Sequence, residues 1–212
     1  MKSNISVIIP TIPRRGMMLS RAVSSVSQQT LPPDSILVPV DHNGLGAGPT
    51  RNEAAVMATT EWIAFLDDDD MMCRSHLEAL MDCIDDKDAD MVYPWFTTIG
   101  ASESALLAPT DDGELVSPEG LVFGPAQRDH IGRGPEGHGA NFIPVTYLIR
   151  RELFLDLGGF PETNSGSWPH QANEDWGFLI QLCRSDANIE HLPTRTWIWN
   201  FHSGSTLGGA IG

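Results

Sequence analysis

Four short apolar runs alternate with helical patterns in the first half of this chain. The runs are rich in β-branched and aromatic residues, as strands are, and they occupy residues 5–10, 36–40, 61–66 and 91–96. Apolar residues at helical spacing lie between them, as in residues 19–26. This alternation predicts an α/β fold with a mainly parallel central sheet and helices on both faces.

Capping and breaker residues sharpen this prediction. Residues 50–53 and 75–78 have the spacing of capping boxes, so each is predicted to open a helix. Pro39 cannot donate a hydrogen bond to a strand ladder. The run at 36–40 is therefore predicted to form an edge strand or to contain a bulge.

The composition changes after residue 96, where Gly, Pro, Ser and Asp become frequent. Residues 120–140 are especially rich in glycine and are predicted to form a flexible loop. Apolar patterns return in residues 142–160, 173–183 and 196–202. No repeat and no linker divides the chain, so we expect one domain over residues 1–212.

Charge and composition exclude several partners. The chain has 28 acidic and 13 basic residues, a net charge of −15, which argues against nucleic acid or an anionic membrane surface as the main partner. No segment reaches the roughly 18 apolar residues of a membrane span, so no integral membrane segment is expected. The three cysteines form no CxxC pair and predict neither a disulfide framework nor a zinc site. A cytoplasmic protein is expected.

The strand at 61–66 is followed directly by four aspartates, Asp67 to Asp70. Ligands of parallel sheets bind beyond the carboxyl ends of the strands, where Pro10, Thr11 and Asp41 also lie. In an extended segment Asp67 and Asp69 share one direction and the other two aspartates the opposite one. Two such carboxylates can hold a divalent cation and leave its other positions for phosphate oxygens, whereas the alternative is a solvated acidic turn.

Six motifs occur in an order and spacing that resemble the inverting family-2 glycosyltransferases of the GT-A fold. They are ISVIIPTIPR, ILVPVD, GPTRNEAA, EWIAFLDDDD, LGGF and EDW, and the resemblance covers most of residues 5–203. The resemblance implies a single Rossmann-like GT-A domain. Its residues 1–96 would bind a nucleotide sugar, and residues 97–212 would form the acceptor and catalytic half with a smaller acceptor-side β region.

The resemblance also implies roles for single residues. The D-x-D carboxylates Asp67 and Asp69 would bind Mn²⁺ or Mg²⁺, with His202 as a further ligand or, alternatively, an ordinary surface histidine. The donor, a UDP-sugar, would contact a set of residues at the strand ends: Pro10, Thr11, Arg14, Asp41, Arg51, Asp67 and Asp68.

On the acceptor side, the resemblance makes Asp175 the catalytic base, and Glu174 and Trp176 would shape the acceptor site. An aspartate in the first turn of a helix can also simply stabilise that turn, which is the alternative for Asp175. The segments Asp41-His42-Asn43-Gly44 and Pro13-Arg14 depart from the family pattern on the nucleoside side.

These residues predict a metal-dependent glycosyltransferase that moves a sugar from a nucleotide sugar to an acceptor hydroxyl, on a glycan, protein or small molecule, with inversion. Two alternatives remain open. A strand followed by D-x-D also resembles aspartate-dependent phosphatases, which need a downstream lysine, and Lys87 is the only candidate. The other alternative is a non-catalytic nucleotide-sugar-binding protein.

Overall fold

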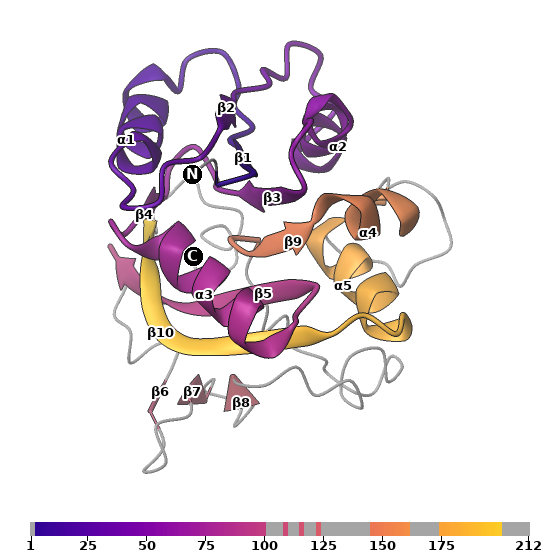
Figure 1. Ribbon diagram of the computed structural model, residues 1–212. Helices are drawn as coiled ribbons and strands as arrows, with labels where there is room; N and C mark the ends of the chain where they lie inside the picture. The colour runs from indigo at the N-terminus through magenta and orange to yellow at the C-terminus, as the bar shows by residue number, and fades with distance from the viewer. Residues whose placement is uncertain are drawn as a thin grey trace.

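The computed structural model describes residues 3–100, 145–161 and 174–200, together with three short strands between the first two ranges. Seven strands form one sheet in the order β2-β1-β3-β9-β5-β10-β4 (Figure 1). These strands are β1 (Ile5–Ile8), β2 (Ser35–Leu37), β3 (Trp62–Phe65), β4 (Met71–Met72), β5 (Met91–Ile99), β9 (Leu148–Arg150) and β10 (Ile189–Asn200). The four strands predicted in the first half are all present.

The sheet is mainly parallel, as predicted. β1 pairs in parallel with β2 and β3, and β5 pairs in parallel with β10. β9 is antiparallel to both of its neighbours, β3 and β5, and β4 is antiparallel to β10. Five strands therefore point the same way, and the carboxyl ends of β1, β2 and β3 meet at one edge of the sheet.

Helices cover both faces of this sheet (Figure 1). They are α1 (Gly16–Ser27), α2 (Ala47–Met57), α3 (His76–Lys87), α4 (Arg151–Asp156) and α5 (Glu174–Arg184). In β3, Ile63 and Phe65 pack with residues of α2, α4 and α5, whereas Trp62 and Ala64 pack with residues of α1 and α3. The alternation of side chains along a strand thus separates two hydrophobic cores.

Two local predictions about helix ends need correction. α2 begins at Ala47 after Gly46, not at the capping box, and the Thr50 hydroxyl donates to the Gly46 carbonyl at 2.7 Å inside the helix. α3 does begin after Ser75, but without a side-chain cap from that residue. Gln29, from the end of α1, accepts a hydrogen bond from the Leu77 amide at 3.0 Å instead. A tertiary contact has replaced the local one.

The prediction for Pro39 is confirmed, because β2 is an edge strand that ends before it. The pairing resumes as an isolated bridge between Thr11 and Val40. This bridge carries the register of β1 and β2 into the loops that follow them.

The second half of the chain completes the same sheet through β9 and β10, so the predicted α/β fold is confirmed. A second, antiparallel sheet contains β6 (Ala108–Pro109), β7 (Leu115–Val116) and β8 (Val122–Phe123). Of the loop predicted at 120–140, the structure describes only β8. Among the described residues no helix is long and apolar enough to cross a membrane.

Candidate active site

The loops after β1, β2 and β3 converge, as the sheet topology predicts. The Asp41 amide donates to the Thr11 carbonyl at 2.8 Å, and the Thr11 hydroxyl donates to the Asp68 carboxylate at 2.5 Å. Residues distant in sequence are thereby brought to one edge of the sheet. Every further feature of the site is arranged around this edge.

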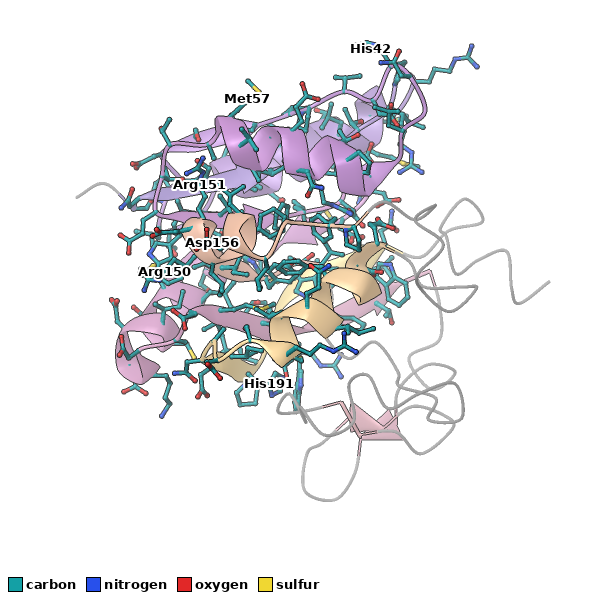
Figure 2. The ribbon with its side chains drawn as sticks, turned by 90° about the vertical axis from the view of Figure 1, so that its right-hand side faces the viewer. His42, Met57, Arg150, Arg151, Asp156 and His191 are labelled. Atoms are coloured by element: carbon teal, nitrogen blue, oxygen red, sulfur yellow. The ribbon has the colours of Figure 1, made fainter. Side chains whose placement is uncertain are left out.

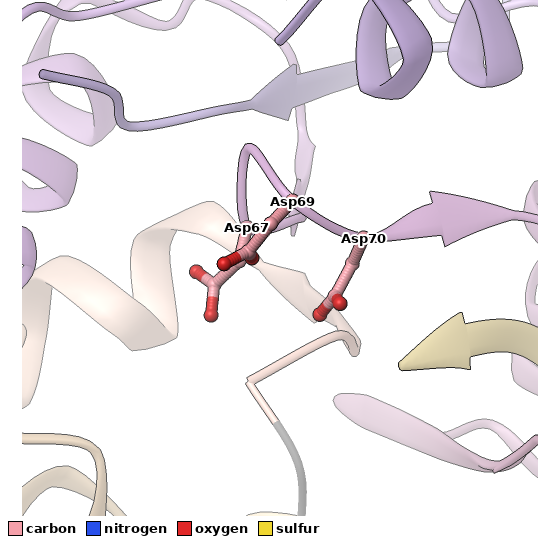
Figure 3. Close-up of side chains that lie close together, drawn as sticks. All are labelled: Asp67, Asp69 and Asp70. Atoms are coloured by element: carbon pink, nitrogen blue, oxygen red, sulfur yellow. The ribbon is translucent and has the colours of Figure 1, made fainter. Parts of the chain in front are cut away.

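Three of the four aspartates form a cluster after β3. Asp67, Asp69 and Asp70 each offer a carboxylate oxygen, and these oxygens lie within 4.8 Å of one another (Figure 3). The predicted grouping is right for Asp67 and Asp69 but wrong for Asp70. The chain turns at residues 68 and 69, with the Asp70 amide donating to the Asp67 carbonyl at 3.1 Å, so strict alternation is lost.

Asp68 is not part of this cluster and is 3% exposed. Besides Thr11, it accepts a hydrogen bond from the guanidinium of Arg15 at 2.6 Å, and Arg15 also reaches Asp69 at 3.2 Å. The hydrogen bond that Arg15 donates to Asp68, and then the charges of the nearby carboxylates, raise the pKa of Arg15. Arg15 was not predicted, although two adjacent arginines follow β1 and the acidic run needs cations.

Arg14, which sequence reasoning did select, is exposed on the same loop with a φ of 93°. A positive φ is uncommon for a residue with a side chain. Of these two neighbouring arginines, only Arg15 contacts the aspartates in the described part of the chain.

Asp70 is buried, and its carboxylate accepts the amide hydrogen of Asn200 at 2.8 Å. Burial, and then the charge of Asp67, raise the pKa of Asp70 to about 9. This environment favours the protonated form of the carboxyl group when no metal ion is bound. Asn200 ends β10, so this contact ties the last described strand to the aspartate turn.

Arg51 in α2 is the second cation of the site and is 3% exposed. Its guanidinium binds Asp67 on one side and Glu174 at 3.1 Å on the other. It also lies 5.3 Å from the centre of the Phe160 ring. Burial alone would lower the pKa of Arg51, but the charges of Asp67 and Glu174 outweigh it, so the pKa is raised. Arg51 thus joins the aspartate turn to the first turn of α5.

Asp41 folds the loop after β2. Its carboxylate accepts backbone hydrogen bonds from Asn43, Gly44 and Leu45 through one oxygen and from Gly46 through the other, all between 2.7 and 3.0 Å. These bonds, those from Gly46 and Leu45 foremost, lower the pKa of Asp41. Gly46 has a φ of 96°, a conformation that favours glycine. Whether Asp41 also contacts a nucleoside stays a prediction.

Glu174 and Asp175 form the first turn of α5, and both are half-buried. Glu174 lies against α2, because a Cβ added to Gly48 would be 2.8 Å from its Cγ. Tyr147 is fully buried nearby; burial, and to a lesser degree the charge of Asp175, raise the pKa of its hydroxyl. The side chain of Trp176 and the whole of His202 lie outside the described residues, so their predicted roles stay predictions.

The chain belongs to glycosyl transferase family 2, since the model of that family matches residues 36–155. The sheet and its covering helices form the Rossmann-like GT-A fold of this family. Comparison with curated proteins gives no match.

Solved structures of TarS from S. aureus have a similar fold. TarS 1-349 in complex with UDP-GlcNAc is 19% identical, with a TM-score of 0.66 over 100% of this chain and 62% of that one. A further crystal structure of TarS 1-349 is 18% identical, with a TM-score of 0.64 over 94% of this chain and 60% of that one. The chain therefore spans about three-fifths of the length of these relatives.

Proposed function

We propose that this protein is a metal-dependent glycosyltransferase that moves a sugar from a UDP-sugar to an acceptor hydroxyl with inversion. The observation that carries this proposal is the cluster of three carboxylates after β3, which Arg51 joins to the acidic first turn of α5. Acidic groups of the proposed donor side and acceptor side are thereby held by one buried cation. Similarity to a fold solved with UDP-GlcNAc supports a uridine nucleotide as donor.

Asp67, Asp69 and Asp70 are proposed to hold Mg²⁺ or Mn²⁺, with His202 as a further ligand. Carboxylate oxygens are the ligands that both ions prefer. The raised pKa of Asp70 reflects burial and an excess of negative charge at this point, which suits a cation. When bound, the ion would neutralise charge on the leaving diphosphate as a Lewis acid.

The loops after β1 and β2 are proposed to bind the nucleotide through Pro10, Thr11, Arg14 and Asp41. Asp68 supports them by fixing Thr11 and Arg15 through its buried carboxylate. Because Asp41 already binds the amides of its own loop, the loop is formed before a nucleoside arrives. Arg51 contributes positive charge near the diphosphate.

Asp175 is proposed to be the base that accepts the proton of the acceptor hydroxyl, in line with the leaving group. Glu174, its neighbour, is engaged by Arg51, and its carboxylate balances that buried cation. Because its carboxylate is held in this ion pair, Glu174 is proposed to orient the first turn of α5. Trp176 is proposed to form a surface for the acceptor.

The phosphatase alternative loses support from the position of Lys87. Its ammonium lies 3.0 Å from Asp86 at the last turn of α3, whereas the aspartate turn precedes the first turn of that helix. Arginines rather than lysine neutralise the aspartates among the described residues. Trapping of a phosphoaspartate would nevertheless revive this alternative.

The proposal is tested by a screen of nucleotide sugars with Mn²⁺ or Mg²⁺, read by release of free nucleoside diphosphate. We expect release with a UDP-sugar in the presence of a hydroxyl acceptor, and a product whose anomeric configuration, measured by NMR, is opposite to that of the donor. Retained configuration would contradict inversion. Binding of UDP-sugars without turnover in any acceptor mixture would favour a non-catalytic binding protein.

A further inference from the structure

The side-chain amide of Asn52 makes two hydrogen bonds to the backbone of Phe160. Its Nδ2 donates to the Phe160 carbonyl at 2.8 Å, and its Oδ1 accepts from the Phe160 amide at 2.9 Å. Asn52 lies in α2, and Phe160 ends the turn after α4. A side-chain amide carries a donor and an acceptor on one planar group, so it can pair with both the carbonyl and the amide of one residue.

The turn is shaped to receive this amide. Gly158 and Gly159 have φ values of 84° and 67°, which residues with side chains rarely adopt. A Cβ added to Gly159 would lie 2.5 Å from the Asn52 Oδ1, so no larger residue fits without moving Asn52. The position of the turn is therefore set by Asn52 rather than by local packing alone.

The same turn lies against α5. A Cβ added to Gly177 would be 2.5 Å from Cγ of Pro161, and the rings of Phe160 and Phe178 are 5.4 Å apart. α2 also approaches α5 directly, because Gly48 leaves room for Glu174 and Phe160 together. Contacts thus run without a gap from Asn52 through the turn at 157–161 to the first two turns of α5.

We propose that Asn52 is a positioning residue that fixes α5, and with it Glu174 and Asp175, relative to the aspartates after β3. Arg51, the preceding residue of α2, links the aspartates to α5 by ion pairs with Asp67 and Glu174. Asn52 positions α5 by directional hydrogen bonds to the turn that packs against it. Its catalytic consequence rests on the proposed function. Asn52 itself contacts neither the aspartates nor the acidic turn of α5 in the described structure.

The test compares Asn52→Asp and Asn52→Ala with Asn188→Asp. Asn188 is a matched control, because its Nδ2 also donates to backbone carbonyls, those of Lys87 and Asp88 at 3.0 and 3.1 Å, at the opposite end of α3 from the aspartates. The Asn52→Asp variant removes the N–H donor and places an ionised oxygen against the Phe160 carbonyl. The Asn52→Ala variant removes both hydrogen bonds to the Phe160 backbone without adding charge.

Two measurements separate positioning from plain stability. Hydrogen exchange in the peptide containing α5 needs no substrate; we expect faster exchange in both Asn52 variants and not in Asn188→Asp. Transfer per folded molecule should fall roughly 10- to 100-fold in the Asn52 variants, as small misplacements of catalytic groups do, with UDP-sugar affinity retained. Asn188→Asp should transfer like the wild type even where its melting temperature falls.

An internal check uses pH. In the Asn52→Asp variant, protonation of the introduced carboxylate restores a donor, now an O–H, toward the Phe160 carbonyl. The ratio of variant to wild-type transfer should therefore rise as pH falls toward 5. The Asn52→Ala variant should show no such rise. Unchanged exchange in α5, or unchanged transfer per folded molecule in an active enzyme, would overturn the inference. If the wild-type protein transfers no sugar but the variants show the expected exchange pattern, the proposed function is overturned, whereas the positioning of α5 by Asn52 is supported.

Discussion

The guanidinium of Arg51 is 3% exposed and binds the carboxylate of Asp67, which is 43% exposed. A buried cation therefore holds one of the proposed metal ligands from the protein side, while the other side of that carboxylate faces solvent. Because Arg51 also binds Glu174, its charge is shared between two carboxylates. The positive charge of Arg51 and a divalent cation must compete for Asp67.

We therefore expect the Arg51→Gln variant to bind Mn²⁺ more tightly than the wild type when no nucleotide is present. Removing a charge about 4 Å away is worth at least about 1 kcal/mol, or roughly a fivefold gain. Calorimetric titration of Mn²⁺ measures it. The Arg21→Gln variant is the control, since Arg21 contacts Met71 rather than the aspartates. Weaker Mn²⁺ binding in Arg51→Gln would show that Arg51 does not compete with the metal.

The Asp69→Asn variant should lose metal-dependent donor binding and keep its fold. The Asp69 side chain is 15% exposed and belongs to no hydrophobic core, so its loss leaves the packing intact. Affinity for a UDP-sugar, measured with Mn²⁺ and with EDTA, should differ in the wild type and in an Asp82→Asn control but not in Asp69→Asn. Equal wild-type affinity in both conditions would refute metal dependence.

The Asp175→Asn variant should bind the donor normally and transfer poorly. Asparagine keeps the shape and can still stabilise the first turn of α5, but it cannot accept a proton at neutral pH. We expect transfer to fall about 10²–10⁴-fold, the usual range for a general base. Single-turnover kinetics at saturating donor measure the chemical step. Near-normal turnover would return Asp175 to a capping role.

The Gly48→Ala variant should destabilise the protein by about 1–3 kcal/mol, the usual cost of overpacking. The new Cβ would lie 2.8 Å from Glu174 Cγ and 3.3 Å from Phe160 Cβ. The Gly16→Ala variant is a matched control in the first turn of α1, where nothing lies within 4 Å of the new Cβ. Urea unfolding should show a lower free energy of unfolding than the wild type for Gly48→Ala and a higher one for Gly16→Ala. Equal stabilities of the two variants would contradict this close packing.

His76 should make the protein less stable in mild acid. Burial lowers its pKa from 6.5 to about 3. Between these values the unfolded chain binds a proton that the folded protein does not, so the free energy of unfolding falls as pH falls. The slope is about 1.4 kcal/mol per pH unit for one proton. Denaturant unfolding from pH 6 to 4 should be less pH-dependent in His76→Gln, whereas substitution of the exposed His42 by Gln should leave the slope unchanged.

The sequence predicted the fold well because β1, β3 and the first part of β5 are largely apolar runs of buried residues. The end of β3, and with it the aspartates, could be located for the same reason. The antiparallel strand β9 was not predicted. Its three residues run directly into α4, and their pattern is equally compatible with the start of that helix.

The charge partners of the site could not be read from sequence. Arg15 and Arg51 reach the aspartates only because the tertiary fold brings α1 and α2 to the end of β3. Arg150, labelled in Figure 2, also joins two carboxylates, those of Glu61 and Asp90 at 2.6 and 3.4 Å, but at the other end of β3. Likewise, Asp70 left its predicted side because a turn, and not an extended segment, follows the strand.

β9 lies between β3 and β5 in the sheet although it follows both in the chain. As the chain leaves the ribosome, β3 and β5 therefore exist before the strand that joins them, and each keeps an unpaired edge. Sheets that depend on such distant pairings form slowly, and open strand edges invite association with other chains. While the chain from Ile99 to Leu148 is synthesised, both strands thus expose edges, and the second edge of β5 stays open until β10 is made. We expect aggregation and binding of a chaperone to be favoured during this part of synthesis.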